Sequence, residues 1–394
     1  MESGQAGALS GIRVIELAAM GPVPFCGMLL GDMGADVIRI DRVGGSDLGV
    51  EMRPEHDLRG RGKRSIAIDV KLPVGREAFL SLAAGADIVM EGFRPGVVER
   101  LGIGPKECMA ARPSLVYGRA TGWGQDGPLA ETSGHDINYI AVAGALGLIG
   151  PEGGAPVPPL NLVGDYGGGA LYLALGLLAA VIRARVSGRG QVVDAAMIDG
   201  VNSLLTVFHG FQQHGQHLDP RGANILDGGA PYYACYRTSD GGYMAAGPIE
   251  PRFHARMIER LGLDPAALPD QDDRARWPEL RARLAARFLT RTRAEWTEIF
   301  AGSDACVTPV LSLEEARMHP HNAARGTMVT VDGVLHPRPA PRLSETPSAI
   351  RRPPPRPGQH TREILAECGF DAARIEEGLR SGAFHAPDAR KGSD

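Results

Sequence analysis

The sequence predicts an α/β protein that has a parallel sheet covered by helices and a second, smaller α/β domain. Three observations lead to this fold class. The chain has 394 residues, enough for two to three domains of roughly 150 residues each. Its first half alternates short apolar runs with helical patterns, which is typical of parallel sheets covered by helices. After a glycine-rich connector at 219–229, charged helical segments replace this alternation.

The elements of the first half are predicted from their apolar runs and turn residues. Strands are expected at 13–17, 37–41, 65–70, 87–91, 115–119 and 191–196. Helices are expected at 24–34, 76–84, 96–101 and 198–213, and an apolar helix at 167–182. The apolar run is shorter than the roughly 20 residues that span a bilayer. It therefore predicts a buried helix, and no membrane partner is expected.

The second half has the pattern of a smaller domain followed by an extended segment. Residues 232–236 and 242–246 are expected to pair as antiparallel strands, and helices are expected between 251 and 300 and at 311–319. Prolines dominate 337–357, which predicts a linker or a strap, and 360–381 has a helical pattern. The predicted parts are a large domain (1–198), a linker helix with a connector (199–228) and a small α/β domain (229–320). A linker that returns to the large domain and ends in a helical tail (321–394) follows them.

Composition and charge exclude several classes of function. The chain has 42 Lys and Arg against 46 Asp and Glu, a net charge of −4. It therefore has no overall positive charge that would attract nucleic acid. Five scattered cysteines without a Cys-x-x-Cys pair argue against a disulfide framework and against zinc or iron–sulfur sites. No basic and apolar leader begins the chain. We expect a cytoplasmic protein.

Phosphate-binding and metal-binding motifs are absent or open to two interpretations. Neither Gly-x-Gly-x-x-Gly nor a P-loop occurs, which removes the usual support for nicotinamide or P-loop chemistry. The glycines at 167–169 fit either an anion site at a helix N-terminus or close packing. No histidine pair has acidic or cysteine companions, so no metal site is expected. Four basic residues of one loop fit either a solvated loop or a clamp for a phosphate-bearing cofactor: Arg59, Arg61, Lys63 and Arg64.

Two titratable residues stand near the starts of expected helices. His135 precedes a helical pattern, and a helix N-terminus keeps a histidine neutral and able to act as a base. Asp136 fits a simple N-terminal cap. Asp165 precedes three glycines and the apolar helix, where it fits either a cap or an acid in a dry cleft with a tuned pKa. If His135 and Asp165 converged, one could take a proton from a carbon and the other could return one to the opposite face.

Long motifs follow one another along the chain: LSGIRVIELAAMGPVPFCGMLLGDMGADVIRIDR, GKRSIAIDVK, EGFRPGVVERLGIG, TGWGQDGP, GHDINY, PPLNLVGDYGGG, GQVVDAAMIDG, GAPYYACYRTSDGGYMAAGPIEPRF and SDACVTPVL. In these motifs the chain resembles the alpha-methylacyl-CoA racemases, which belong to the class III CoA-transferase (CaiB/BaiF-type) superfamily. The resemblance extends to about residue 345. It implies a Rossmann-like large domain that binds CoA, a small α/β domain and an interlocked homodimer.

The resemblance also implies the roles of individual residues. His135 and Asp165 stand where the racemases have their two acid/base residues. Glu250 stands where the family has a carboxylate that supports the histidine, supplied by the same or the partner chain. The loop at 43–57 is longer than in close family members, so its contacts are the least constrained. CoA binding carries over onto Arg42, Ile68, Asp69, Val70, Lys71, Gly92, Phe93, Arg94, Arg100, Gly134, Asp136, Ile137, Asn138 and Tyr139.

The histidine separates the enzyme classes within the superfamily. In the transferases the aspartate attacks an acyl-CoA covalently, and a Gly-Tyr-Asp type of sequence typically stands where this chain has Gly134-His135-Asp136. Proton transfer between two faces needs a second titratable group opposite the carboxylate, and His135 supplies it. Alternatives are a class III CoA transferase with Asp165 as the nucleophile, and a non-catalytic acyl-CoA-binding protein.

The predicted activity is therefore that of a racemase or epimerase acting on (2R)- and (2S)-2-methylacyl-CoA thioesters. A 1,1-proton transfer would pass through an enolate, whose oxygen needs a hydrogen-bond donor. The backbone N–H of Asp165, or that of a neighbour, is the candidate donor. CoA enters as part of the substrate, and no metal, flavin, nicotinamide or pyridoxal cofactor is expected.

Overall fold

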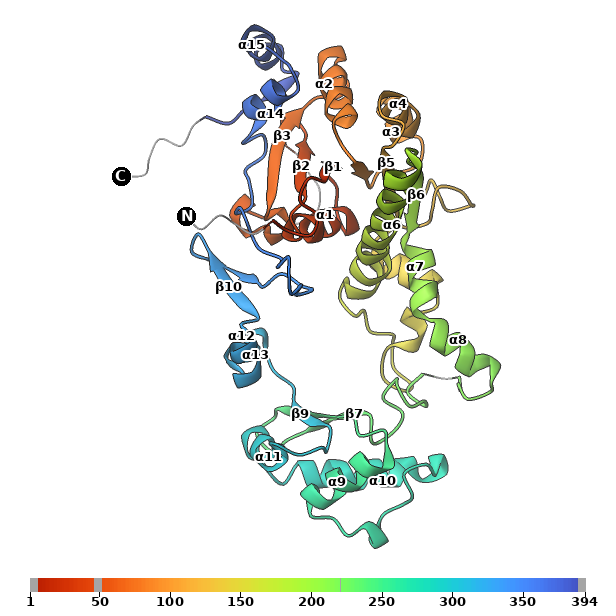
Figure 1. Cartoon of the computed structure of the whole chain (residues 1–394). Coiled ribbons are helices and arrows are strands. Elements are labelled where there is room, and N and C mark those ends of the chain that lie inside the picture. The colour runs from red at the N-terminus through yellow and green to blue at the C-terminus, as the bar shows by residue number, and fades with distance from the viewer. Residues whose placement is uncertain (1–5, 46–51, 220, 389–394) are drawn as a thin grey trace. The chain divides into compact units, whose positions relative to one another are not determined.

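The chain forms two compact units in the computed structural model, which describes residues 6–45, 52–219 and 221–388 (Figure 1). The large unit consists of Met1–Ala143, Leu160–Leu204 and Gly326–Asp394. The small unit consists of Gly144–Pro159 and Leu205–Arg325. Part of the predicted long loop at 43–57 lies outside the described residues.

A seven-stranded sheet forms the centre of the large unit. Six of its strands are parallel, in the order β3-β2-β1-β4-β5-β6, which is the strand order of a Rossmann fold. The predicted parallel sheet is thereby confirmed. The strands are β1 (Arg13–Leu17), β2 (Asp36–Asp41), β3 (Lys63–Ile68), β4 (Ile88–Glu91), β5 (Val116–Thr121) and β6 (Val192–Ala196).

Helices cover both faces of this sheet, as the continuous apolar character of its central strands requires. One apolar cluster joins the strands to α1 and α6, and the other joins them to α2, α14 and α15. Helix α4, between β4 and β5, is an element that the sequence analysis missed. The helices are α1 (Pro22–Asp32), α2 (Pro73–Ala84), α3 (Val97–Arg100), α4 (Pro105–Ala111), α5 (Asp136–Val142), α6 (Leu171–Ser187), α7 (Met197–Leu204), α14 (Thr361–Glu367) and α15 (Ala372–Arg380).

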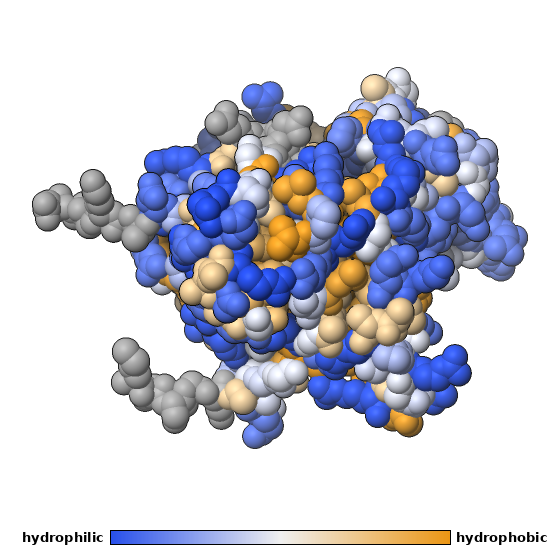
Figure 2. Space-filling model, turned by 90° about the horizontal axis from the view of Figure 1, so that it is seen from above, coloured by the Kyte–Doolittle hydropathy of each residue, from blue (hydrophilic) through white to orange (hydrophobic). Residues whose placement is uncertain are grey.

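The apolar run that predicts a buried helix is only partly buried. It begins as a π-helix at Leu162–Ala170 and continues as α6. By length and composition alone, Leu162–Ser187 could cross a membrane, but 44% of its most apolar window is buried, and core helices pass the same test. Hydrophobic residues reach the surface between hydrophilic ones on the face of the molecule that Figure 2 shows. Four exposed apolar residues recur at helical spacing along α6: Leu171, Leu175, Ile182 and Val186.

The small unit has its own antiparallel sheet and apolar core. Strands β7 (Ala234–Arg237) and β8 (Tyr243–Ala246) confirm the predicted pair, and β9 (Val307–Pro309), too short to show a pattern, adds a third. The predicted helix at 198–213 is two helices, because Leu205 leaves helical geometry before α8. The helices of this unit are α8 (Thr206–Gln213), α9 (Pro251–Leu261), α10 (Trp277–Phe288), α11 (Arg293–Phe300), α12 (Leu313–Met318) and α13 (Pro320–Arg325).

The C-terminal segment is a strap along the large unit. It opens with an unpredicted hairpin, β10 (Met328–Val331) and β11 (Val334–Pro337), and continues through residues 338–360 without a helix or a strand. Its backbone bonds directly to the large unit, for instance from Gly62 N–H to the Arg352 carbonyl at 2.9 Å. At its end, β12 (Phe384–His385) pairs antiparallel with β3, an edge strand too short for the sequence to reveal.

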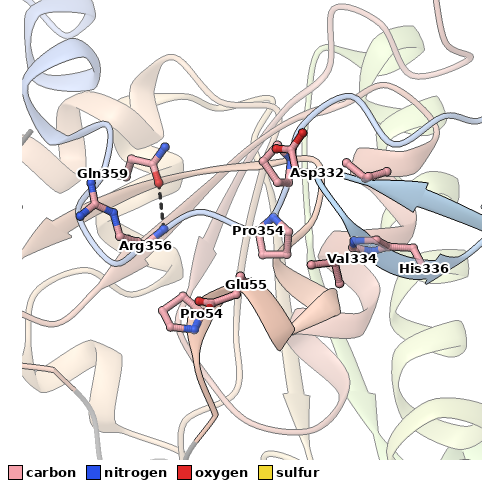
Figure 3. Close-up of a pocket in the computed structure, with 10 residues that line it drawn as sticks. Pro54, Glu55, Asp332, Val334, His336, Pro354, Arg356 and Gln359 are labelled. Carbon is pink, nitrogen blue, oxygen red and sulfur yellow. Dashed lines mark hydrogen bonds between the residues drawn. The ribbon is translucent and has the colours of Figure 1, made fainter. Parts of the chain in front are cut away.

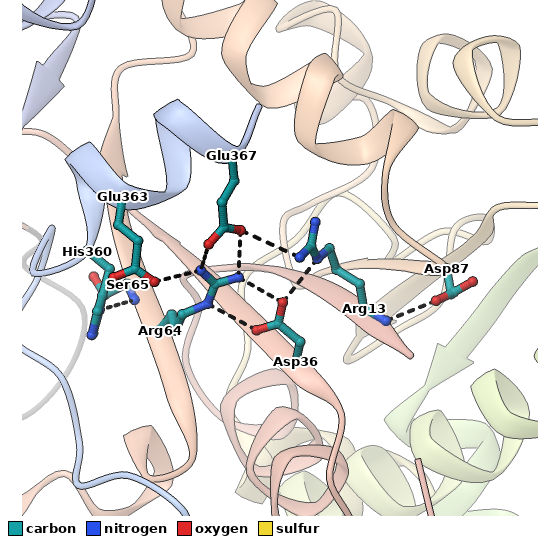
Figure 4. Close-up of polar contacts among 8 residues, drawn as sticks. All are labelled: Arg13, Asp36, Arg64, Ser65, Asp87, His360, Glu363 and Glu367. Atoms are coloured by element: carbon teal, nitrogen blue, oxygen red, sulfur yellow. Dashed lines mark hydrogen bonds and ion pairs between the residues drawn. The ribbon is translucent and has the colours of Figure 1, made fainter. Parts of the chain in front are cut away.

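The cluster of basic residues at 59–64 holds the fold together. Lys63 and Arg61 form buried ion pairs, each at 2.6 Å, with Glu16 and Asp32 respectively. Arg64 bonds to Asp36 and to two glutamates of α14, Glu363 and Glu367 (Figure 4). Arg59 pairs with Asp57 at 2.7 Å. Arg61, Lys63 and Arg64 are buried in these pairs, so for them the solvated-loop and phosphate-clamp interpretations are wrong. The pair of Arg59 with Asp57 is partly exposed, and for Arg59 both interpretations stay predictions.

Candidate active site

A cavity of about 250 Å³ lies where parallel strands of the large sheet end. Strands β1 and β4 are neighbours, and the strand order reverses direction at this point, which is where open α/β sheets bind ligands. The cavity is lined by residues that follow β1, β2 and β4, and by residues at the end of β5 and just after it. The segments that contain His135 and Asp165 complete the lining. Its lining includes Ala18, Ala19, Gly21, Arg42, Gly92, Phe93, Thr121, Gly122, Gly134, His135, Tyr139 and Asp165.

His135 and Asp165 both line this cavity, so the structure brings together the two residues whose convergence the sequence left open. His135 is the N-cap residue of α5, with extended backbone angles. Its backbone N–H donates to Asn138 Oδ1 at 3.0 Å, which fixes the turn into the helix. The imidazole is exposed, so a ligand can reach it.

Asp136, the neighbour of His135, forms a hydrogen bond with the backbone of Asp165. It is buried, it is the first residue of α5, and its Oδ2 accepts the Asp165 backbone N–H at 2.7 Å. The prediction that Asp136 is an N-cap is wrong. The Asp165 N–H was expected to donate to an enolate oxygen, but in the structure it donates to Asp136 instead. The backbone N–H of Asp136 itself stands at a helix start, where no intrahelical partner is available.

Asp165 lies within the π-helix, not at a helix cap. Burial raises the pKa of Asp165, the Asp136 carboxylate raises it further, and Asn161, His135 and Arg59 oppose both effects. Asn161 Nδ2 donates to Asp165 Oδ2 at 3.1 Å. A raised pKa is compatible with the predicted acid in a cleft, because it favours a form that can donate a proton.

Two glycines that the sequence analysis did not single out shape the walls around these groups. Gly21, at φ +66°, faces the Asp165 carboxylate, and a Cβ placed there would lie 3.1 Å from its Cγ and Oδ1. Gly122 makes room for the ring of Tyr139, whose hydroxyl donates to the Gly134 carbonyl directly before His135. The Tyr139 ring also packs edge-on against Trp123, with centroids 4.8 Å apart. Such contacts between distant segments leave no sequence signal.

A second cavity of about 370 Å³ adjoins the first. The two share the residues Ala18, Arg42 and Phe93, and the Arg42 guanidinium lies 6.0 Å from the centre of the Phe93 ring. Guanidinium and ammonium groups in such a groove suit phosphate. Seven predicted CoA-binding residues line the second cavity: Arg42, Ile68, Asp69, Val70, Lys71, Phe93 and Arg100.

Some predicted site residues lie elsewhere. Glu250 belongs to the small unit, where it is exposed at the N-cap of α9. Gly92, Gly134 and Tyr139 line the first cavity. Four members of the predicted CoA-binding set are absent from the linings of both cavities: Arg94, Asp136, Ile137 and Asn138.

A third cavity, of about 590 Å³, contains none of the predicted residues (Figure 3). The β10–β11 hairpin, the strap and Pro54–His56 surround it. His336 lines it, is fully buried and has no partner for either ring nitrogen within the described part of the chain. Burial lowers the pKa of His336, which keeps its ring neutral.

The glycines at 167–169 serve helix packing. A Cβ at Gly168 would lie 2.8 Å from the Val201 backbone nitrogen of α7, and one at Gly200 would overlap the Gly168 carbonyl. Of the two interpretations of this run, close packing is confirmed. Within residues 6–45, 52–219 and 221–388, no group of three or more His, Cys, Asp and Glu side chains could hold a metal ion.

Comparison with known proteins gives consistent matches along most of the chain. The model of CoA-transferase family III matches residues 9–361. Alpha-methylacyl-CoA racemases of Mus musculus and Homo sapiens are 45% and 44% identical, covering 93% of this chain and 95% of each relative. The succinyl-CoA:glutarate CoA-transferase of Mus musculus is 30% identical, with 95% of this chain and 90% of the relative covered. A crystal structure of a CAIB/BAIF family protein from Brucella suis is similar, with a TM-score of 0.80, 27% identity, and 92% and 100% coverage.

Proposed function

This chain belongs to CoA-transferase family III, and we propose that it is a racemase that interconverts the (2R) and (2S) epimers of 2-methylacyl-CoA thioesters. Relatives named as such racemases are 45% and 44% identical to it, against 30% for a named transferase of the family. The observation that carries the proposal is that His135 and Asp165 line one cavity. That cavity adjoins the groove lined by most of the predicted CoA-binding residues.

The proposed substrate lies along both cavities. Arg42, Lys71 and Arg100 supply positive charge for the phosphates of CoA in the second cavity. The pantetheine arm passes Phe93, which both cavities share, and delivers the thioester to the first cavity. The α-carbon then lies between His135 and Asp165. The acyl chain itself is not specified by these contacts.

The proposed reaction is a 1,1-proton transfer. Neutral His135 removes the α-proton of one epimer, and protonated Asp165 returns a proton to the opposite face of the planar enolate; the roles reverse for the other epimer. The backbone N–H groups at the start of α5, which directly follows His135, are the candidate donors for the enolate oxygen. Because the thioester carbonyl delocalises the negative charge, this reaction requires no further cofactor.

We also propose that the active protein is an interlocked homodimer in which Glu250 of the same or the partner chain orients His135. The exposed apolar stripe on α6 (Leu171, Leu175, Ile182 and Val186) supports a subunit interface, because such a stripe is costly in water. Interlocked chains cannot exchange without opening. Mixing folded His135→Ala and Glu250→Ala dimers should therefore leave activity unrestored, whereas co-expression should restore some. Rapid complementation on mixing, or a fully active monomer, would contradict the proposal.

Hydrogen exchange at the α-carbon tests the activity. Incubation of a single epimer of a 2-methylacyl-CoA in deuterium oxide should place deuterium at the α-carbon of both epimers. Absence of exchange would overturn the proposal. Hydroxylamine provides a second measurement. A transferase would form a covalent adduct on Asp165 during turnover, and hydroxylamine would trap that adduct. Inactivation by hydroxylamine, with activity kept in a His135→Ala variant, would identify a transferase instead.

A further inference from the structure

One wall of the CoA groove is a turn that a buried carboxylate holds in place. Strand β4 ends at Glu91, and the next two residues, Gly92 and Phe93, line the catalytic cavity. The Glu91 side chain is itself fully buried and lines neither cavity. Its Oε2 accepts the Phe93 backbone N–H at 2.5 Å. The carboxylate thus sets the direction in which the chain leaves the sheet at the groove.

Arg119 on the neighbouring strand β5 extends this contact along the wall. It stands beside Glu91 in the parallel ladder, and its Nε donates to Glu91 Oε1 at 3.0 Å. One terminal nitrogen of the same guanidinium donates to Glu99 Oε1 at 2.8 Å. Glu99 belongs to α3, whose residues Val97 and Arg100 line the second cavity. One buried guanidinium therefore ties both ends of the wall to the sheet.

We infer that Glu91, Arg119 and Glu99 are positioning residues that set the CoA-binding wall formed by residues 92–100. The inference rests on the proposed function, since it assigns these residues to acyl-CoA binding. Glu91 accepts its hydrogen bond from the backbone N–H of Phe93, and the ring of Phe93 faces the Arg42 guanidinium. A buried ion pair is by itself weak evidence for stability. A role in placing Phe93 and Arg100 explains why the charges lie directly behind the groove.

Substitution of Glu91 by its amide separates positioning from chemistry. In Glu91→Gln a single oxygen faces two donors, the Phe93 N–H and the Arg119 Nε–H, so one buried donor loses its acceptor. We expect the Kd of free CoA, measured by titration calorimetry, and the KM for the acyl-CoA to rise about tenfold. The kcat should change less than threefold, because neither His135 nor Asp165 is touched. Glu99→Gln, at a partly exposed position, should raise both constants by about threefold.

A matched control removes a similar ion pair away from the groove. Asp32 and Arg61 form an ion pair at 2.6 Å that is buried like the pair of Glu91 and Arg119. Neither Asp32 nor Arg61 lines the two cavities. Asp32→Asn should lower the Tm without changing the Kd of CoA. The inference is overturned if folded Glu91→Gln binds CoA within twofold of the parent protein, or if Asp32→Asn weakens binding equally.

Two further outcomes are distinguishable. If Glu91→Gln does not fold, Glu99→Gln decides, and unchanged CoA binding in that variant overturns the inference. If the parent protein binds CoA but shows no α-deuterium exchange, the racemase proposal fails, and the positioning role is still judged from the Kd values alone.

Discussion

Replacement of Gly21 by alanine should disturb the catalytic carboxylate directly. Gly21 has φ +66° and ψ −118°, a conformation essentially restricted to glycine. An added methyl would lie 3.1 Å from Cγ and Oδ1 of Asp165, closer than the roughly 3.5–4.0 Å that two carbon atoms prefer. The carboxylate must therefore move by a few tenths of an ångström, or the backbone must shift.

The expected magnitude has two parts. The backbone conformation costs about 1–3 kcal/mol of folding free energy, measured by urea unfolding. Because a 1 Å misplacement can cost about 10²-fold in rate, the smaller displacement here should lower α-deuterium exchange by roughly tenfold or more. Gly11→Ala is the matched control, since Gly11 also has a positive φ, +84°, but no atom within 4 Å of the added Cβ. If Gly21→Ala exchanged as fast as Gly11→Ala, the placement of Asp165 against Gly21 would be refuted.

Three further predictions concern individual side chains. His135→Ala should lower kcat by ~10²–10⁴ with unfolding unchanged, and Glu250→Ala should lower it less; equal losses would make Glu250 a proton carrier. Asp165→Asn should be inactive yet unfold at a higher temperature at pH 7, because the raised pKa of Asp165 means that its charged form is costly in the folded state; a lower Tm would contradict this. Burial raises the pKa of Glu91 from 4.5 to about 7, so between these pH values the folded protein holds a proton there that the unfolded chain has lost, and above pH 7 Glu91 is the carboxylate that pairs with Arg119. Between about pH 4.5 and 7 the free energy of unfolding should therefore fall with rising pH by up to about 3 kcal/mol, and Glu91→Gln should flatten that slope; a slope of opposite sign would contradict it.

The parallel sheet was predictable because its central strands are buried on both faces and appear as continuous apolar runs. Strand β12 was not, because Phe384 and His385 are too few to show a period, and only pairing with β3 makes them a strand. The exposed stripe of α6 was missed for a related reason. An all-apolar sequence does not reveal which of its faces the rest of the chain will cover.

The candidate site was predictable as a set of residue types but not as an arrangement. His135 and Asp165 stood out through their places beside a helix start and a glycine run. The partner of Asp136 was hidden, because Asp165 lies 29 residues away along the chain. The basic loop misled for the same reason, since Lys63 meets Glu16 only once β1 and β3 share a sheet. Spacing in sequence reports local geometry, whereas these ion pairs depend on the complete topology.

The late closure of the large sheet has a consequence during synthesis. Strand β3 is complete at Ile68, but the strand that pairs with its outer edge comes roughly 300 residues later, after the entire small unit. At 5–20 residues per second, a ribosome needs roughly 15–60 s to deliver it. Throughout that interval the edge of β3 can pair with other nascent chains. A product that ended before Phe384 would keep this edge open permanently.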